Sequence, residues 1–278
     1  MISTAQKQQF DDQGYLVLRG LFSPEEIQTL TDHYMEIRQQ GQKPGDFSGV
    51  DLTSQDPLKK FPRMIHMHRW DELSLQWMLD SRIADALTGL MGAEPYAVQT
   101  MIYFKPPQAR GQAVHQDQYY LRVQPGTCIA AWLALDTCDE ETGCIRVIPG
   151  SQKWPLLCTI KADTTQSFTD VTVPIPDGTA VEPVLMAPGD MLFFNGQLVH
   201  GSGPNHSHDR FRRSLIGHYI AGEAQKVAQY YHPALRMDGS VIELETSQGG
   251  GSCGIWVDEE GQPAIEMAGV EGLSGRTE

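Results

Sequence analysis

Three residues from two distant parts of the sequence have the right types to hold one metal ion. His115 and Asp117 stand two positions apart, so on an extended segment their side chains point to the same side. A second isolated imidazole, His200, follows much later in the chain. Two histidines and one carboxylate form the facial triad that holds non-haem Fe(II) and leaves positions open for a substrate and dioxygen. If the fold brings the three residues together, the pattern indicates an iron oxygenase.

A cationic pair, Arg212 and Arg213, follows His200. A guanidinium can bind a carboxylate through two parallel hydrogen bonds, so this pair suggests a keto-acid co-substrate. Adjacent residues on a strand face opposite ways, and only one of the two should point inward. His-x-Asp alone is a weak signal in a chain with nine His and 35 acidic residues. A hydrogen-bonded pair without a metal is the simpler alternative for His115 and Asp117.

Five separated motifs carry a resemblance to a known family. In chain order they are GYLVLRG at 14–20, KPP at 105–107, HQDQ at 115–118, GCIRVIPGS at 143–151 and HGSGPN at 200–205. Over roughly residues 5–220 the chain resembles the phytanoyl-CoA dioxygenase family of Fe(II)/2-oxoglutarate-dependent oxygenases, which is broad in substrate. The resemblance implies Fe(II), 2-oxoglutarate as co-substrate and O2, with His115, Asp117 and His200 as the iron ligands.

The resemblance also implies which residues contact 2-oxoglutarate. Arg212 matches the arginine that binds the distal carboxylate, although one extra residue before the pair keeps Arg213 as an alternative. Ser202 matches a position that adds a hydroxyl hydrogen bond. Trp132 resembles the aromatic residue that lines the co-substrate pocket, with a buried core tryptophan as the alternative. Gln112 is a further candidate for contact with the co-substrate.

Asp117 bears on the type of oxidation that the resemblance implies. Related halogenases carry a small residue in its place, so the carboxylate points to hydroxylation or another oxidation of an unactivated C–H bond in a small organic molecule. Desaturation or ring formation would need only a different substrate pose. Two other classes stay open: a cupin-like metal enzyme without a keto acid, and a non-catalytic jelly-roll binding protein. Arg212 and Ser202 argue against the first, and the complete ligand set argues against the second.

Candidate substrate contacts flank the metal motif. Tyr103 and Tyr120 should border the open face of the metal, and simple packing is the alternative for every candidate. His66 and His68 have the spacing of a metal pair but lack a third partner nearby, so packing or substrate contact is favoured for both. The substrate candidates are Tyr103, Tyr119, Tyr120, Arg122 and His66.

The elements that must position these residues change character near residue 95. Residues 1–95 are mainly helical in pattern, with a short strand at 15–18 and a loop over 41–62. Ser23, Pro24 and Glu26 form a strong helix start, with a capping residue, Pro in the first turn and Glu three positions after the cap. Helices are expected at 4–12, at 24–40 and, as one or two helices, at 70–92.

From residue 96 the sequence consists of short apolar runs separated by Gly and Pro. Many short strands of this kind favour a mostly β fold with a double-stranded β-helix core, that is, a jelly roll or cupin-like barrel, over 96–220. The N-terminal helices should pack against it. Residues 221–278 are expected to be an irregular extension, and 1–278 to form a single oxygenase domain. The expected strands are 97–104, 128–135, 144–148, 169–174, 181–187, 191–194 and 214–220. Residues 151–190 should form a long excursion that contains one or two strands.

Composition limits the partners and the compartment. The net charge of −14 argues against a nucleic-acid partner and makes a heavily phosphorylated substrate less favoured, unless a local basic pocket overrides the total. Five cysteines without a Cys-x-x-Cys pair indicate free thiols in a reducing compartment. No signal peptide is recognisable, and no apolar run approaches the ~20 residues of a membrane helix. We therefore expect a cytoplasmic enzyme for a small molecule, a monomer or homodimer, without nucleic acid or membrane.

Overall fold

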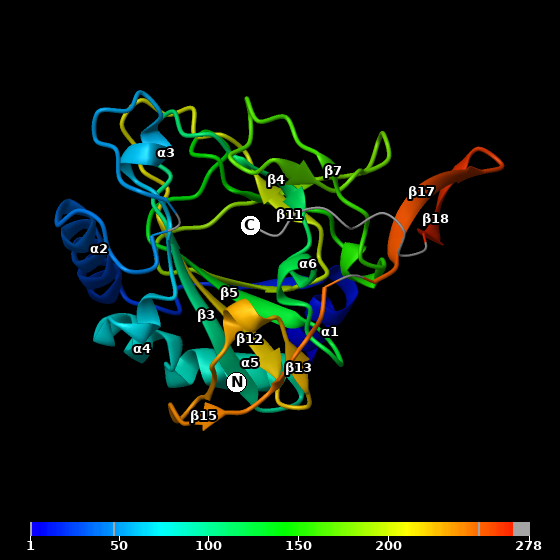
Figure 1. Ribbon diagram of the computed structural model, residues 1–278, viewed down its shortest axis with the longest axis horizontal. Helices are drawn as coiled ribbons and strands as arrows, with labels where there is room; N and C mark the ends of the chain where they lie inside the picture. Colours follow the sequence, from blue (N-terminus) through cyan, green and yellow to red (C-terminus); the bar gives the residue numbers. More distant parts are fainter. Residues whose placement is uncertain (1, 47, 250, 269–278) are drawn as a thin grey trace.

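Two antiparallel sheets face each other and form the centre of the protein (Figure 1). The computed structural model describes residues 2–46, 48–249 and 251–268. The larger sheet has the order β1-β10-β5-β12-β3-β14-β15, with β2 added beside β3, and the smaller sheet has the order β4-β11-β6-β9. The large-sheet strands are β1 Tyr15–Leu18, β10 Met191–Asn195, β5 Cys128–Ala134, β12 Ser214–Ala221, β3 Pro95–Tyr103, β14 Ala234–Arg236, β15 Val241–Ile242 and β2 Met64–Ile65. Those of the small sheet are β4 Gln112–His115, β11 His200–Ser202, β6 Ile145–Val147 and β9 Glu182–Val184.

Both faces of the large sheet are covered, and strand β5 shows how. Its side chains alternate between two separate apolar clusters: Ala131 and Leu133 join the cluster shared with the helices, while Ala130 and Trp132 join the cluster between the sheets. Successive residues of a strand point to opposite faces. Because both faces are buried, β5 reads in the sequence as a continuous apolar run and not as an alternating one.

The N-terminal helices cover the face of the large sheet that points away from the small sheet (Figure 1). Helix α2 begins as the sequence predicts: the Ser23 hydroxyl accepts from the backbone N–H of Glu26 at 3.3 Å, and the Glu26 carboxylate accepts from that of Ser23 at 2.8 Å. The jelly-roll core with packed N-terminal helices is confirmed. The covering helices are α1 Thr4–Gln13, α2 Pro24–Gln39, the 3-10 helix η1 Met67–Arg69, α4 Glu72–Met78 and α5 Ser81–Met91. The short helix α3 Pro57–Lys60 has no buried residue and lies away from this face (Figure 1).

Several segments differ from the prediction. The expected loop over 41–62 contains the short helix α3. The strand expected at 169–174, within the excursion over 151–190, is reduced to β8 (Val171–Thr172), which pairs with β7 (Ile160–Lys161). The side chains of both strands are not buried, so few apolar contacts stabilise longer strands here. The strand expected at 181–187 is reduced to Glu182–Val184.

The C-terminal part is not irregular where the structure describes it. Besides β14 and β15, β13 (Lys226–Val227) pairs with β16 (Glu245–Thr246), and β17 (Cys253–Glu259) forms a hairpin with β18 (Gln262–Ala268). Short exposed strands carry weak apolar patterns, which explains the error. The prediction for 269–278 lies outside the described residues.

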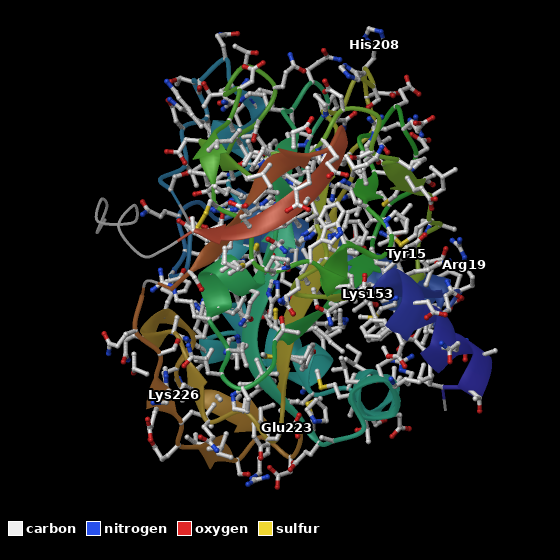
Figure 2. The ribbon with its side chains drawn as sticks, turned by 90° about the vertical axis from the view of Figure 1, so that its right-hand side faces the viewer. Tyr15, Arg19, Lys153, His208, Glu223 and Lys226 are labelled. Atoms are coloured by element: carbon white, nitrogen blue, oxygen red, sulfur yellow. A yellow bond between two sulfur atoms is a disulfide. The ribbon has the colours of Figure 1, made fainter. Side chains whose placement is uncertain are left out.

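A disulfide joins Cys158 to Cys253, so the prediction of free thiols is wrong for these two residues. The other three cysteines are free and buried. The hairpin β17–β18 carries Cys253 to the segment 155–158, where the Cys158 N–H donates to the Gly254 carbonyl at 2.9 Å. Figure 2 views the molecule from the side on which this hairpin lies. No helix in the described part of the chain is long and apolar enough to cross a membrane.

Candidate active site

The small sheet brings the two predicted histidine ligands together. His115 is the last residue of β4, His200 is the first of β11, and the two are direct partners in the antiparallel register. Asp117 lies just past β4, where it begins the short helix α6 (Gln118–Leu121) with helical dihedral angles. It is therefore not on the extended segment that the spacing suggested, because the chain turns directly after His115.

The three side chains converge despite this turn. Asp117 Oδ1 lies 3.4 Å from His115 Nε2 and 3.8 Å from His200 Nε2. One possible ligand atom from each residue falls within 4.8 Å of the others, and all three residues are buried. The Phe194 ring packs 4.4 Å from that of His200, which closes one side of the site.

Backbone carbonyls orient both imidazoles for metal binding. His115 Nδ1 lies 2.9 Å from the Ala113 carbonyl oxygen, and His200 Nδ1 lies 3.0 Å from that of Leu198. A carbonyl only accepts, so each Nδ1 carries the proton and each Nε2 presents its lone pair toward Asp117. This is the arrangement of metal-binding histidines, whose second nitrogen donates to a carbonyl or carboxylate. The donor set fits a divalent iron ion.

The charge states also suit a metal. Burial opposes ionisation of Asp117, but the imidazoles of His200, His115 and His218 outweigh it and hold the pKa of this carboxyl well below its usual range. Burial, helped by His115, lowers the pKa of His200 to about 4, so its imidazole is neutral near pH 7. The site therefore offers one anionic oxygen ligand and neutral imidazole nitrogen.

Two further residues contact the predicted metal ligands. His218 on β12, which had no role in the sequence-based prediction, lies with Nε2 3.2 Å from Asp117 Oδ2. It lies within an apolar strand, where the sequence pattern indicates a residue of the hydrophobic core. The amide nitrogen of Gln112 lies 3.2 Å from His115 Nε2, so its described contact is with a predicted ligand, and its contact with a co-substrate stays a prediction.

Arg212 and Arg213 point to different surroundings. Arg212 is only 4% exposed, lines the cavity beside the triad, and places its guanidinium carbon 5.2 Å from the centre of the Trp132 ring. Its Nη1 donates to the Ser214 hydroxyl at 3.1 Å, and its Nε has no hydrogen-bond partner among the described residues. Arg213 instead forms a bidentate pair with Asp136 at 2.8 and 2.7 Å.

A buried lysine, Lys105, stands beside this arginine and was missed as a functional residue. Its ammonium donates to the Ser202 hydroxyl at 3.0 Å, to the Gly143 carbonyl at 2.9 Å and to the Gly203 carbonyl. Burial and the charge of Arg212 hold its pKa well below the usual value. The signal in the sequence was the Lys105–Pro106–Pro107 motif, which supported the resemblance but received no chemical role.

One cavity of about 780 Å³ contains the triad, Arg212, Lys105, Ser202 and Trp132. Of the substrate candidates, Tyr103, Tyr120 and Arg122 also line it. Tyr119 is not among the lining residues and packs edge-on against Tyr120 at 5.0 Å. His66 lies behind the wall, with its ring 4.7 Å from that of Tyr230. A volume of this size is typical of sites for small molecules, about 300–1,000 Å³.

A jelly roll that joins two histidines and a carboxylate beside buried cations has the architecture of a non-haem iron oxygenase. Comparison with known proteins gives the family. The profile of the family described as "Phytanoyl-CoA dioxygenase (PhyH)" matches residues 10–214. The peroxisomal phytanoyl-CoA dioxygenase of Rattus norvegicus is 25% identical over 242 residues, covering 82% of this chain and 71% of the relative. Phytanoyl-CoA dioxygenase 1 of Oryza sativa subsp. japonica is 27% identical over 228 residues, covering 70% and 81%.

Solved structures share the fold. The epimerase SnoN in complex with Fe3+, alpha ketoglutarate and nogalamycin RO has a TM-score of 0.63 at 19% identity, covering 80% of this chain and 84% of SnoN. EctD from S. alaskensis with 2-oxoglutarate and 5-hydroxyectoine has a TM-score of 0.61 at 22% identity, covering 79% and 76%.

The chain belongs to the phytanoyl-CoA dioxygenase family. It is a non-haem iron dioxygenase that depends on 2-oxoglutarate, with Fe(II) as its metal and O2 as the oxidant. The predictions of family, enzyme class and cofactors are confirmed.

Proposed function

We propose that the enzyme oxidises an unactivated C–H bond of a small organic molecule, with His115, Asp117 and His200 holding the iron. The observation that carries this proposal is the cavity that places the three converging side chains beside the buried cations Arg212 and Lys105. Bound Fe(II) supplies the oxidation: one atom of O2 enters the substrate as a hydroxyl group, the other enters succinate, and 2-oxoglutarate loses CO2.

The two cations are proposed to bind the co-substrate. Arg212 suits the distal carboxylate, since a guanidinium donates two parallel hydrogen bonds to a carboxylate and the Trp132 ring packs against it. The Lys105 ammonium donates three hydrogen bonds, to a hydroxyl and two carbonyls, and these favour its charged form although burial lowers its pKa. It therefore adds a second positive charge, and both residues favour a dianion over a neutral ligand. In a buried site these charges act with little screening by water. Trp132 and Phe194 form apolar walls that keep water from the reacting atoms.

Hydroxylation is the proposed outcome, and the position of the substrate carbon relative to the iron would decide it. The fold supports other outcomes in other proteins, since one structural neighbour is described as an epimerase and another as a carbocyclase. Asp117 converges with the two histidines and can serve as the carboxylate ligand, which supports transfer of oxygen as the outcome. Tyr103, Tyr120 and Arg122 are proposed as substrate contacts, because they line the same cavity.

We also propose that the chain works as one oxygenase domain, as a monomer or homodimer, in the cytoplasm. The three buried free thiols are compatible with a reducing compartment, whereas the Cys158–Cys253 disulfide is more typical of an oxidising one. Thiol trapping in intact cells followed by mass spectrometry tests the compartment. If the disulfide persists in cells in which cytoplasmic control proteins are reduced, the cytoplasmic assignment is wrong. Light scattering of the purified protein gives the oligomeric state.

An anaerobic titration tests the catalytic proposal. Fe(II) and 2-oxoglutarate are added to the purified protein, and the weak visible charge-transfer band of the ternary complex is followed. We expect the band with wild type and its loss after Asp117→Ala. A metabolite panel is then supplied with O2, and succinate release is compared with O2 consumption. A protein that forms no band, or that turns over substrates without producing succinate, would contradict the proposal.

A further inference from the structure

The cavity is basic although the protein is strongly acidic. Six basic side chains and two carboxylates line it, in a chain whose net charge is −14. One carboxylate is Asp117, at the metal site. The other, Asp56, accepts from Arg110 at 2.7 Å. A cavity with this local sign attracts anions even when the whole molecule repels them, because low-dielectric walls focus the field.

The six basic residues differ in their place in the cavity. Lys105 and Arg212 serve the co-substrate in the proposed function. Arg110 pairs with Asp56 and donates to the Thr164 carbonyl at 2.9 Å. Lys59 and Arg122 are exposed residues at the rim. The sixth is Arg63, which is half-buried within the wall just before β2.

Arg63 is held among aromatic side chains. Its Nη1 donates to the Tyr103 hydroxyl at 2.9 Å, and its guanidinium carbon lies 5.4 Å from the centre of the Phe168 ring. Tyr120 and Tyr230 line the same cavity as Arg63. The Tyr120 ring lies 6.1 Å from the His115 ring. A planar cation flanked by rings therefore lines the cavity that contains the metal site.

The imidazole and phenol groups around this guanidinium are uncharged near pH 7 because they are buried. Burial, with Arg69 and His68 adding to it, lowers the pKa of His66 to about 3, so its imidazole is neutral near pH 7. Burial and Arg69 lower that of His68 to about 4. Burial, with the charge of Asp117, raises the pKa of Tyr120 to about 12, so its hydroxyl is neutral too. The tyrosines thus offer hydroxyl groups and ring faces, and Arg63 offers charge.

We infer that the substrate is an organic carboxylate whose anionic group is bound by Arg63 while its apolar body lies against Tyr103, Tyr120 and Phe168. This inference rests on the proposed function, because it assigns the substrate of that same site. A guanidinium and an adjacent hydroxyl donor suit a carboxylate in a two-point contact. The aromatic walls suit an apolar body, and the cavity volume leaves room for both it and 2-oxoglutarate.

Matched pairs of ligands test the inference. The probes are alkyl and aryl carboxylic acids, from octanoate to dodecanoate and from 3-phenylpropionate to 5-phenylvalerate, each paired with its primary amide. Affinities are measured by calorimetry with the anaerobic Fe(II)/2-oxoglutarate protein. We expect at least one acid to bind roughly 10- to 100-fold more tightly than its amide, as hydrogen bonds to a charged group imply. Absence of such a preference across the panel, including absence of any binding, overturns the inference.

Variants assign the preference to Arg63. Arg63→Gln should reduce the acid-to-amide ratio to within about twofold of one, and Arg63→Lys should restore part of it. Lys59→Gln, which removes a rim cation of the same cavity, is the matched control and should leave most of the ratio intact. Circular dichroism and the melting temperature show which variants fold. If Arg63→Gln does not fold, the acid-to-amide ratio of the wild type still tests the inference. A ratio that survives in folded Arg63→Gln contradicts the assignment.

The test separates this inference from the proposed function. The affinity for 2-oxoglutarate is measured in the same variants, and Arg63→Gln should change it less than twofold. A large loss of 2-oxoglutarate affinity in Arg63→Gln would instead make Arg63 a co-substrate residue and overturn the inference. If the wild type forms no complex with Fe(II) and 2-oxoglutarate, the proposed function fails. In that case the affinities for the acids and their amides are measured with the protein in the absence of Fe(II) and 2-oxoglutarate.

Discussion

The imidazole of His218 holds the outer oxygen of Asp117, with Nε2 3.2 Å from Oδ2 and both residues buried. A carboxylate only accepts, so His218 carries its proton on Nε2 and leaves Oδ1 as the oxygen that faces His115 and His200. This contact joins the central strand of the large sheet to the metal site beside the small sheet. His218 is therefore a positioning residue for the carboxylate.

Removal of this contact should weaken iron binding. With His218→Ala we expect the Kd for Fe(II) to rise roughly 10- to 100-fold, because outer partners of metal ligands typically contribute that much. His218→Gln keeps a donor and should recover part of the loss. The measurement is anaerobic Fe(II) titration in competition with a chelator. His33→Ala, which removes a histidine bonded to Asp71 on the helical side, is the control and should leave the Kd unchanged. An unchanged Kd in His218→Ala would show that the contact is only structural.

Substitution of the two adjacent arginines should affect co-substrate binding differently. Arg212→Ala removes the buried guanidinium from the cavity, and we expect the Kd for 2-oxoglutarate to rise roughly 10- to 100-fold. Arg213→Ala removes the pair with Asp136 outside the cavity and should change that Kd less than twofold. Both values come from the charge-transfer titration. If Arg213→Ala has the larger effect on the Kd, the assignment of the co-substrate arginine is wrong.

The metal triad was predicted from the family resemblance that five separated motifs carry, and the jelly roll was favoured by short apolar runs between Gly and Pro. Strands buried on both faces appear as long apolar runs, so the strands expected at 97–104 and 214–220 match β3 (Pro95–Tyr103) and β12 (Ser214–Ala221) closely. Short exposed strands give no such run, which is why β17 and β18 were missed.

The missed site residues depend on tertiary register. His218 lies within an apolar strand, and only the pairing of β12 between β3 and β5 directs it to Asp117. Lys105 was visible as part of a motif, but its burial beside Arg212 depends on the fold. The disulfide joins residues 95 positions apart, and it depends on a hairpin for which the sequence shows no clear strand pattern.

The disulfide should support both stability and the metal site. Segment 155–158 is bonded to Gln116, which lies between two predicted ligands: its amide donates to the Pro155 carbonyl at 3.2 Å and accepts from the Leu157 N–H at 2.8 Å. Loss of a crosslink across a long loop costs about 2–5 kcal/mol. We expect Cys253→Ser to lower the melting temperature and to weaken Fe(II) binding. A reducing agent should reproduce both effects in wild type and add nothing in Cys253→Ser. Unchanged Fe(II) affinity would show that the hairpin is independent of the site.

The start of helix α2 gives a pH-dependent contribution to stability. Hydrogen bonds from Arg82 and from the backbone of Ser23 lower the pKa of Glu26 to about 2. A carboxyl with a depressed folded-state pKa stabilises the protein above its unfolded pKa, about 4.3, and loses that contribution as the pH falls toward 2. Because the Glu26 side chain is 41% exposed, we expect only about 1 kcal/mol after screening.

Glu26→Gln should therefore be less stable than wild type at pH 7 by about 1 kcal/mol, and the difference should shrink between pH 4 and pH 2. Urea unfolding of both proteins at pH 7, 5 and 3 measures this difference. Glu36→Gln, farther along the same helix, is the control for general charge and should show little change across the range. A Glu26→Gln deficit that persists undiminished at the lowest pH at which both proteins fold would mean that the lost stability comes from geometry of the capping box and not from the carboxylate charge.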